Sequence, residues 1–76
     1  MPMSELERKA AFKSAVTMKR MTMERAAREV MGVSVHHLTE GLAGRRVLSE
    51  AVEERFAAFI GMKRVSVFGE RMAAVA

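Results

Sequence analysis

The sequence contains no cysteine, so neither disulfide bonds nor a thiolate zinc site can stabilise the fold. Tyrosine and tryptophan are also missing, which argues against an aromatic platform on which single-stranded nucleic acid would stack. Aspartate, asparagine and glutamine are absent as well, so many usual catalytic side chains are not available. With 76 residues the chain forms one domain at most, and a homodimer is expected because so small a core is weakly stable alone.

Long apolar runs are missing too. None approaches the roughly 18 residues that cross a bilayer, and the first residues, MPMSELERK, are charged where a signal peptide needs an apolar stretch. We therefore expect a cytoplasmic protein without membrane contact. Thirteen Lys and Arg residues against nine acidic ones give a net charge of +4, which favours a polyanionic partner.

Short hydroxyl residues in front of apolar periodic segments predict the starts of the helices. These N-cap residues are Ser4, Thr22, Ser34 and Ser49. We expect the first helix to end near residue 20, the second near residue 31, the third near residue 43 and the fourth at residue 60. Glycine follows the last three helices, where a left-handed residue ends a helix at no steric cost.

The third and fourth helices have clear inner faces. In the third, Leu38 and Leu42 are four residues apart and therefore point to the same side. Gly41 inside this helix indicates that the helix is short or that a neighbouring backbone packs closely against it. The apolar stripe of the fourth helix consists of Val52, Phe56, Phe59 and Ile60.

The second and third helices, with a glycine turn between them and an amphipathic helix behind, make a helix-turn-helix arrangement. The segment MTMERAAREVMGVSVHHLTEGLAGRRVLSEAVEERFAAFIG, residues 21–61, resembles the DNA-binding domain of the phage repressor or Cro-like (Xre-type) family. The matching positions are Thr22, Ala27, Gly32, Val33, Ser34, Leu38, Leu42, Gly44, Arg45, Ser49 and Gly61. The resemblance covers a little over half of the chain. It implies an all-α fold, a compact four- to five-helix bundle that binds operator DNA as a dimer with the third helix in the major groove.

One departure from the family pattern lies in the second helix. The segment AREVMG, which ends at the turn glycine, carries one residue more than the commonest form of the family. We therefore expect this helix to end in an extra or tightened turn.

We assign residues 1–61 to the helix-turn-helix DNA-binding domain and residues 62–76 to a C-terminal extension. In the extension, Val65 and Val67 alternate around Ser66 as in a strand, whereas GERMAAVA is compatible with a short helix or a frayed end. The extension pairs two chains, covers the core or has no structural role. These alternatives stay open from the sequence.

The third helix, over residues 34–43, is the expected recognition helix. Its N-terminal part approaches base edges, where a valine contacts a thymine methyl group, a histidine donates to guanine and a glutamate accepts from cytosine N4. The predicted base contacts are Val35, His36, His37, Thr39 and Glu40. Without asparagine or glutamine, specificity is expected to depend on G·C pairs or on DNA shape. The predicted phosphate contacts are Lys19, Arg20, Thr22, Ser34, Arg45 and Arg46.

Other interpretations of these residues are weaker. His36 and Glu40 are four residues apart and could share a metal ion, but no cysteine and no third ligand accompany them. The same pair could act as an acid and a base, yet no nucleophile, phosphate loop or cofactor motif is present. We therefore expect no metal, no cofactor and no enzymatic activity.

The chain has eight methionines, which suggest either an adaptable partner-binding groove or an irregular core, and the core interpretation is favoured. The methionines assigned to that core are Met18, Met21, Met23 and Met31. The leading hypothesis is a transcription regulator, of the repressor type, that binds double-stranded DNA sequence-specifically. The alternative is a helical protein-interaction module, an adaptor or antitoxin-like partner, in which the DNA role is lost.

Overall fold

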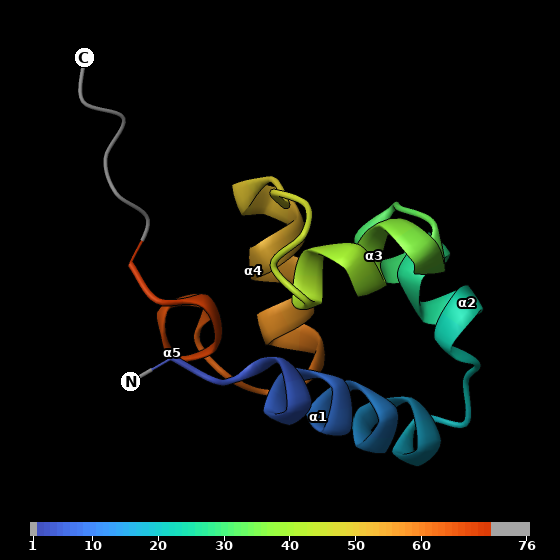
Figure 1. Cartoon of the computed structure of the whole chain (residues 1–76). Helices are drawn as coiled ribbons and strands as arrows, with labels where there is room; N and C mark the ends of the chain where they lie inside the picture. Colours follow the sequence, from blue (N-terminus) through green and yellow to red (C-terminus); the bar gives the residue numbers. More distant parts are fainter. Residues whose placement is uncertain (1, 71–76) are drawn as a thin grey trace.

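The protein is a small all-α bundle, in agreement with the predicted fold class (Figure 1). The computed structural model describes residues 2–70, and all regular secondary structure in this range is helical. The elements are α1 (Glu5–Met18), α2 (Met23–Ala26), the π-helical segment η1 (Ala27–Met31), α3 (Val35–Leu42), α4 (Glu50–Phe59) and α5 (Arg64–Phe68). Helix α4 stands across α1, with α2 and α3 on one side of it and α5 on the other (Figure 1). Among residues 2–70, no helix combines the length and the apolar character that a membrane crossing requires.

The predicted N-caps are confirmed at all four helices. The side chain of each cap residue accepts a hydrogen bond from a backbone N–H in the first turn that follows it. At Ser4 the capping box is complete, because the Glu7 carboxylate accepts the Ser4 N–H in return at 2.8 Å. These local bonds satisfy backbone donors that no helical carbonyl can reach, and they fix where each helix begins.

The second helix ends in a widened turn, so that of the expected extra or tightened turn the tightened form is wrong. Segment η1 is π-helical, and the N–H of Gly32 donates to the carbonyl of Ala27. A π turn contains one residue more than an α turn, which is compatible with the additional residue that the family resemblance indicates in AREVMG. Ala27 and Met31 both stay fully buried. Gly32 follows with φ 76°, a left-handed conformation that lets the chain turn toward α3.

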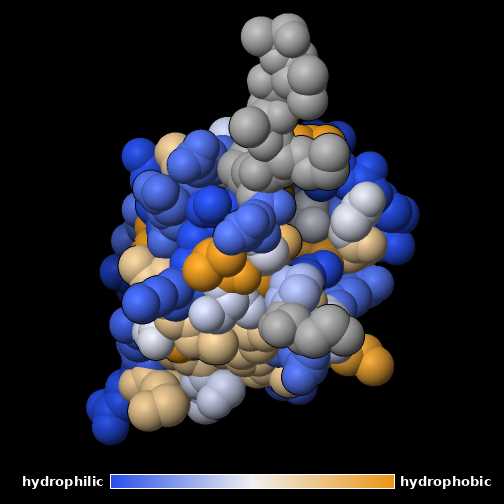
Figure 2. Space-filling model, turned by 90° about the vertical axis from the view of Figure 1, so that its left-hand side faces the viewer, coloured by the Kyte–Doolittle hydropathy of each residue, from blue (hydrophilic) through white to orange (hydrophobic). Residues whose placement is uncertain are grey.

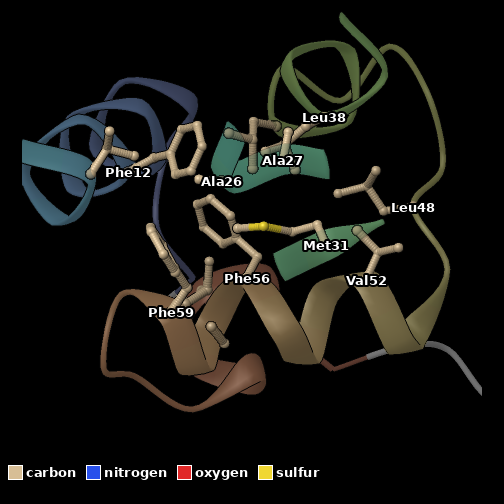
Figure 3. Packing of buried hydrophobic residues seen from close by; sticks show 13 residues of the cluster. Phe12, Ala26, Ala27, Met31, Leu38, Leu48, Val52, Phe56 and Phe59 are labelled. Carbon is tan, nitrogen blue, oxygen red and sulfur yellow. The ribbon is translucent and has the colours of Figure 1, made fainter. Parts of the chain in front are cut away.

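The core is one cluster of apolar side chains supplied by the helices and by the loop before α4 (Figure 3). The ring of Phe12 from α1 lies 5.6 Å from Phe56 and 5.9 Å from Phe59, measured between centroids. The Met31 side chain extends toward Phe56, and Leu38 closes the cluster from α3 (Figure 3). The predicted stripe of α4 therefore meets α1, η1 and α3 at one place.

The methionine assignment is only partly correct. Met31 is fully buried, and Met21 packs against the core while partly exposed. Met18 is 82% exposed and Met23 is 38% exposed. Met18 follows the buried Val16 by two residues, which places it about 200° further around α1 and away from the core.

Residues 64–68 form a helix, so the strand suggested by the alternating valines is wrong. Val67 is fully buried, its carbonyl accepts the Met3 N–H at 3.1 Å, and the ring of Phe68 lies 5.7 Å from that of Phe56. The core therefore continues past the boundary predicted at residue 61. The face that carries α5 mixes hydrophilic and apolar side chains, with a small strongly apolar group near its centre (Figure 2). The end of the GERMAAVA segment, residues 71–76, lies outside the described residues.

Arg8 of α1 connects the start of the chain and α5 to the end of α3. Its Nε and Nη2 donate to the carbonyl of Leu42 at 3.0 and 2.6 Å, and its Nη1 donates to the carbonyls of Met3 at 2.6 Å and Val67 at 3.5 Å. The guanidinium also lies 5.6 Å from the centroid of the Phe68 ring. The last carbonyls of a helix lack helical partners and carry the negative end of its dipole. Arg8 supplies both the donors and the positive charge that the end of α3 needs.

Replacing Arg8 by methionine keeps an unbranched side chain but removes all of these donors. We expect the free energy of unfolding to fall by about 2–3 kcal/mol, because hydrogen bonds from a charged group to half-buried carbonyls are lost. Urea denaturation measures the change. Lys13→Met, on an exposed part of the same helix, is the matched control and should cost less than about 0.5 kcal/mol. Equal losses in the two variants would contradict the stabilising role of Arg8.

The close neighbour of Gly41 is the side chain of Leu48 and not a backbone segment. The other expectation for this glycine, a short helix, agrees with the eight residues of α3. A Cβ on Gly41 would lie 2.3 Å from Cγ and Cδ2 of Leu48, which is only 3% exposed. The leucine belongs to the loop between α3 and α4. Its packing against Gly41 holds this loop against α3.

Gly41→Ala should therefore destabilise the protein by about 1–3 kcal/mol through overpacking, although alanine alone favours a helix by about 1 kcal/mol. In a Leu48→Ala background the same substitution should be neutral or stabilising. A double-mutant cycle of unfolding free energies tests this coupling. Identical losses in both backgrounds would show that the Leu48 contact is not the cause.

Candidate nucleic-acid interface

Helix α3 lies on the outside of the bundle and follows η1 after a three-residue turn, Gly32–Ser34 (Figure 1). Leu38 and Leu42 are buried and attach its inner face to the core, as predicted. Ser34 caps it by accepting the His37 N–H at 3.0 Å. The helix has eight residues and is therefore about 12 Å long. Its outer face is the surface available to a partner.

The five predicted base-contact residues divide into two groups. His36, His37 and Glu40 lie on the outer side, opposite the buried leucines, and the His36 side chain is 77% exposed. Val35 packs against the core while partly buried, and the Thr39 hydroxyl donates to the Val35 carbonyl at 2.7 Å. Val35 and Thr39 thus lie on the flank of α3 and not on its outer side, because their positions on the helix adjoin the leucine stripe.

Both carboxylate oxygens of Glu40 face basic groups. Oε2 accepts a hydrogen bond from Nε of Arg45 at 2.5 Å, and Oε1 lies 3.6 Å from Nε2 of His36. The hydrogen bond from Arg45 is the main reason why the pKa of Glu40 lies below its usual range. Burial opposes this shift, and the charges of Arg45, His36 and Arg46 add to it. The acid on this surface is therefore ionised and balanced by its neighbours.

The loop between α3 and α4 places a second arginine beside the outer face. Nη1 of Arg46 lies 3.2 Å from Nδ1 of His37, a distance at which a neutral imidazole accepts a hydrogen bond from a guanidinium. Arg45 and Arg46 are both exposed. The loop thus holds one guanidinium against Glu40 and the next against His37.

Three other predicted phosphate contacts lie at the turn between α1 and α2. The ammonium of Lys19 is 5.0 Å from the centroid of the Phe59 ring, so this side chain contacts α4 and not α3. Arg20 is exposed with φ 55°, and Thr22 caps α2. The structure therefore separates this group from Ser34, Arg45 and Arg46, which lie at the two ends of α3.

Two lysines of α1 lie beside α3, although the sequence did not assign them to the site. They border a groove between the two helices, lined by Leu6, Lys9, Ala10, Phe12, Lys13, Met23, Thr39 and Leu42. Lys9 pairs with Glu5 at 2.7 Å, whereas Lys13 has no acidic partner within residues 2–70. Their spacing of four residues indicates that they share a face of α1. Which helix that face meets is decided by tertiary packing.

Comparison with protein-family models, with curated proteins and with solved structures finds no match for this chain. The resemblance to the phage repressor or Cro-like family therefore stays a prediction from the residues themselves. Over residues 2–70, the acidic and histidine side chains form no group of three or more that could hold a metal ion. His36 and Glu40 have no third ligand in that range.

Removing Arg45 should change the titration of Glu40. In Arg45→Ala the pKa of Glu40 should rise toward its ordinary value, because the hydrogen bond that favours the carboxylate is lost. Since the folded-state pKa is the depressed one, the stabilisation is present above about pH 4.3 and disappears as the pH falls through the folded value. Nuclear magnetic resonance of the carboxyl carbon follows this titration. Arg46→Ala, which acts on Glu40 only through its charge, should shift the curve less, and equal shifts would contradict the assignment.

Proposed function

We propose that the protein binds double-stranded DNA sequence-specifically and regulates transcription, with α3 in the major groove. The observation that supports this function best is the outer face of α3, where His36, His37 and Glu40 lie next to Arg45 and Arg46 of the following loop. A helix fits the major groove, and side chains of these types reach base edges and phosphates there. The short turn before α3 and the capped start of the helix are the features that a helix-turn-helix requires.

The charges around α3 favour a phosphate backbone. Glu40 is paired with Arg45, so it presents no uncompensated negative charge. Arg46 on the loop side and Lys13 on the α1 side have no acidic partner among the described residues. Two such cations on either side of a helix can each neutralise a phosphate and release its counterion.

We further propose a homodimer in the cytoplasm, associated with the nucleoid. Two copies of α3 would then lie on half-sites roughly 10 bp apart or a multiple of that distance. The small size of the chain supports this state, since a core built by 76 residues gains stability from a partner.

A helical protein-interaction module is the second candidate function. The observation that favours it is the apolar part of the groove between α1 and α3, where Leu6 is 79% exposed and Met23 is 38% exposed. An amphipathic helix of another protein fits such a groove through its apolar side chains. This binding would depend little on salt, whereas DNA binding depends on it strongly.

The salt dependence of binding to a random-sequence duplex tests the proposal. The logarithm of the association constant should fall linearly with the logarithm of the salt concentration, by about 0.9 for each phosphate contacted. Arg46→Gln and Lys13→Gln should each make the slope less steep by about one. Fluorescence anisotropy with a labelled duplex measures the constants.

Lys63→Gln is the matched control. This exposed lysine follows α4, whereas the arginine loop precedes α4, so the length of that helix separates the two sites. The control should leave the slope unchanged. A folded wild-type protein that does not bind duplex would contradict the proposed function, and an equal change in the control would contradict the assigned surface.

A further inference from the structure

We propose that Arg45 reads a guanine base and that Glu40 positions it for this contact. This inference rests on the proposed DNA-binding function and deepens it. The sequence predicted the same role, a phosphate contact, for Arg45 and Arg46, and it predicted that Glu40 contacts a base directly. The observation behind it is the hydrogen bond from Nε of Arg45 to Oε2 of Glu40, which holds a side chain of the loop on the outer face of α3.

The remaining donors of Arg45 suit a base better than a phosphate. A guanidinium carries five N–H donors in a rigid plane, and the bond to Glu40 uses the one on Nε. Nη1 and Nη2 donate to no acceptor within residues 2–70. Two parallel donors at the end of a planar group match N7 and O6 of guanine in the major groove. A phosphate contact needs only a nearby charge, whereas this pairing needs an oriented plane.

Glu40 can orient the plane because it is itself held in place. It belongs to α3, its side chain is only 23% exposed, and its second oxygen faces His36. The carboxylate therefore moves with the helix backbone and fixes the guanidinium relative to the helix. Arg46 lacks this restraint, since its side-chain partner on α3 is the ring of His37 and not a carboxylate. The neighbouring arginines thus carry equal charge but differ in how they are positioned.

The position of Glu40 also explains why the carboxylate is a weaker candidate for direct contact with a base. Each of its oxygens already faces a basic side chain of this chain. A cytosine amine would compete with the hydrogen bond from Arg45, which is charged and therefore the stronger partner. The preference for G·C pairs that the sequence predicts still holds. It now results from a contact of Arg45 with guanine and not from a contact of Glu40 with cytosine.

Selection of binding sites from a random duplex library tests the inference with the full chain. The wild type should select a site with a guanine at a position that Arg45→Lys no longer specifies, because lysine keeps the charge but loses the planar fork. A bidentate guanine contact discriminates by about 1–3 kcal/mol, or roughly 5- to 150-fold. We expect this preference to fall to less than about 3-fold. Arg46→Lys is the matched control and should leave every preference unchanged.

Glu40→Ala and the double variant test the positioning role. Glu40→Ala should relax the same base pair as Arg45→Lys, and combining the two should add little to either. Relaxation of a different base pair by Glu40→Ala would show that Glu40 contacts DNA directly and would overturn the positioning role. An unchanged site in Arg45→Lys, with affinity lowered equally for all sequences, would overturn the guanine contact while duplex binding stands. Absence of duplex binding by the wild type would overturn the proposed function, and this inference with it.

Discussion

The guanidinium of Arg8 is the contact on which the placement of α3 depends. It donates to the carbonyl of Leu42, 34 residues away in the sequence, and to that of Val67, 59 residues away. Carbonyl groups at a half-buried helix end need donors. Arg8 supplies them to Leu42 and, beside the Met3 N–H, to Val67. One side chain of α1 therefore fixes the end of α3 and the start of the chain together with α5. The buried leucines of α3 then determine which of its faces is turned outward.

The start of α3 depends on a different constraint. The π turn of η1 keeps both Ala27 and Met31 in the core, and the left-handed Gly32 turns the chain immediately afterwards. Nη1 of Arg55, from α4, lies 3.5 Å from the Met31 carbonyl at this helix end. Arginine side chains from two different helices thus contact the carbonyls on which η1 and α3 end. The end of η1 and the end of α3 together determine the direction of α3. The end of α3 also determines where the loop with Arg45 begins.

The features that could be predicted from the sequence are those in which cause and effect lie within one helical turn. The N-caps at Ser4, Thr22, Ser34 and Ser49 and the outer position of His36 are of this kind. The alternation of Val65 and Val67 gave the wrong element, because five residues hold too few periods to distinguish a strand from a helix that buries one valine. The lysines beside α3 and the network of Arg8 depend on which helices meet. The bond between Glu40 and Arg45 spans only five residues, yet it depends on how the loop leaves α3, and Leu48 decides this through its packing on Gly41.

The distribution of charge also limits how α3 can act in the proposed function. Many of the basic side chains are paired with glutamates on the same helix or an adjacent segment, as in Lys9 with Glu5, Arg25 with Glu29 and Arg28 with Glu24. Beside α3, Arg45 is likewise paired with Glu40, whereas Arg46 and Lys13 have no acidic partner among residues 2–70 and remain to attract phosphates. Under the proposed function, the orientation of donors adds sequence discrimination that charge alone does not provide. The carboxylate of Glu40 lowers the positive charge beside α3. In return it holds the planar guanidinium of Arg45 in a fixed direction, which long-range attraction to phosphates cannot do.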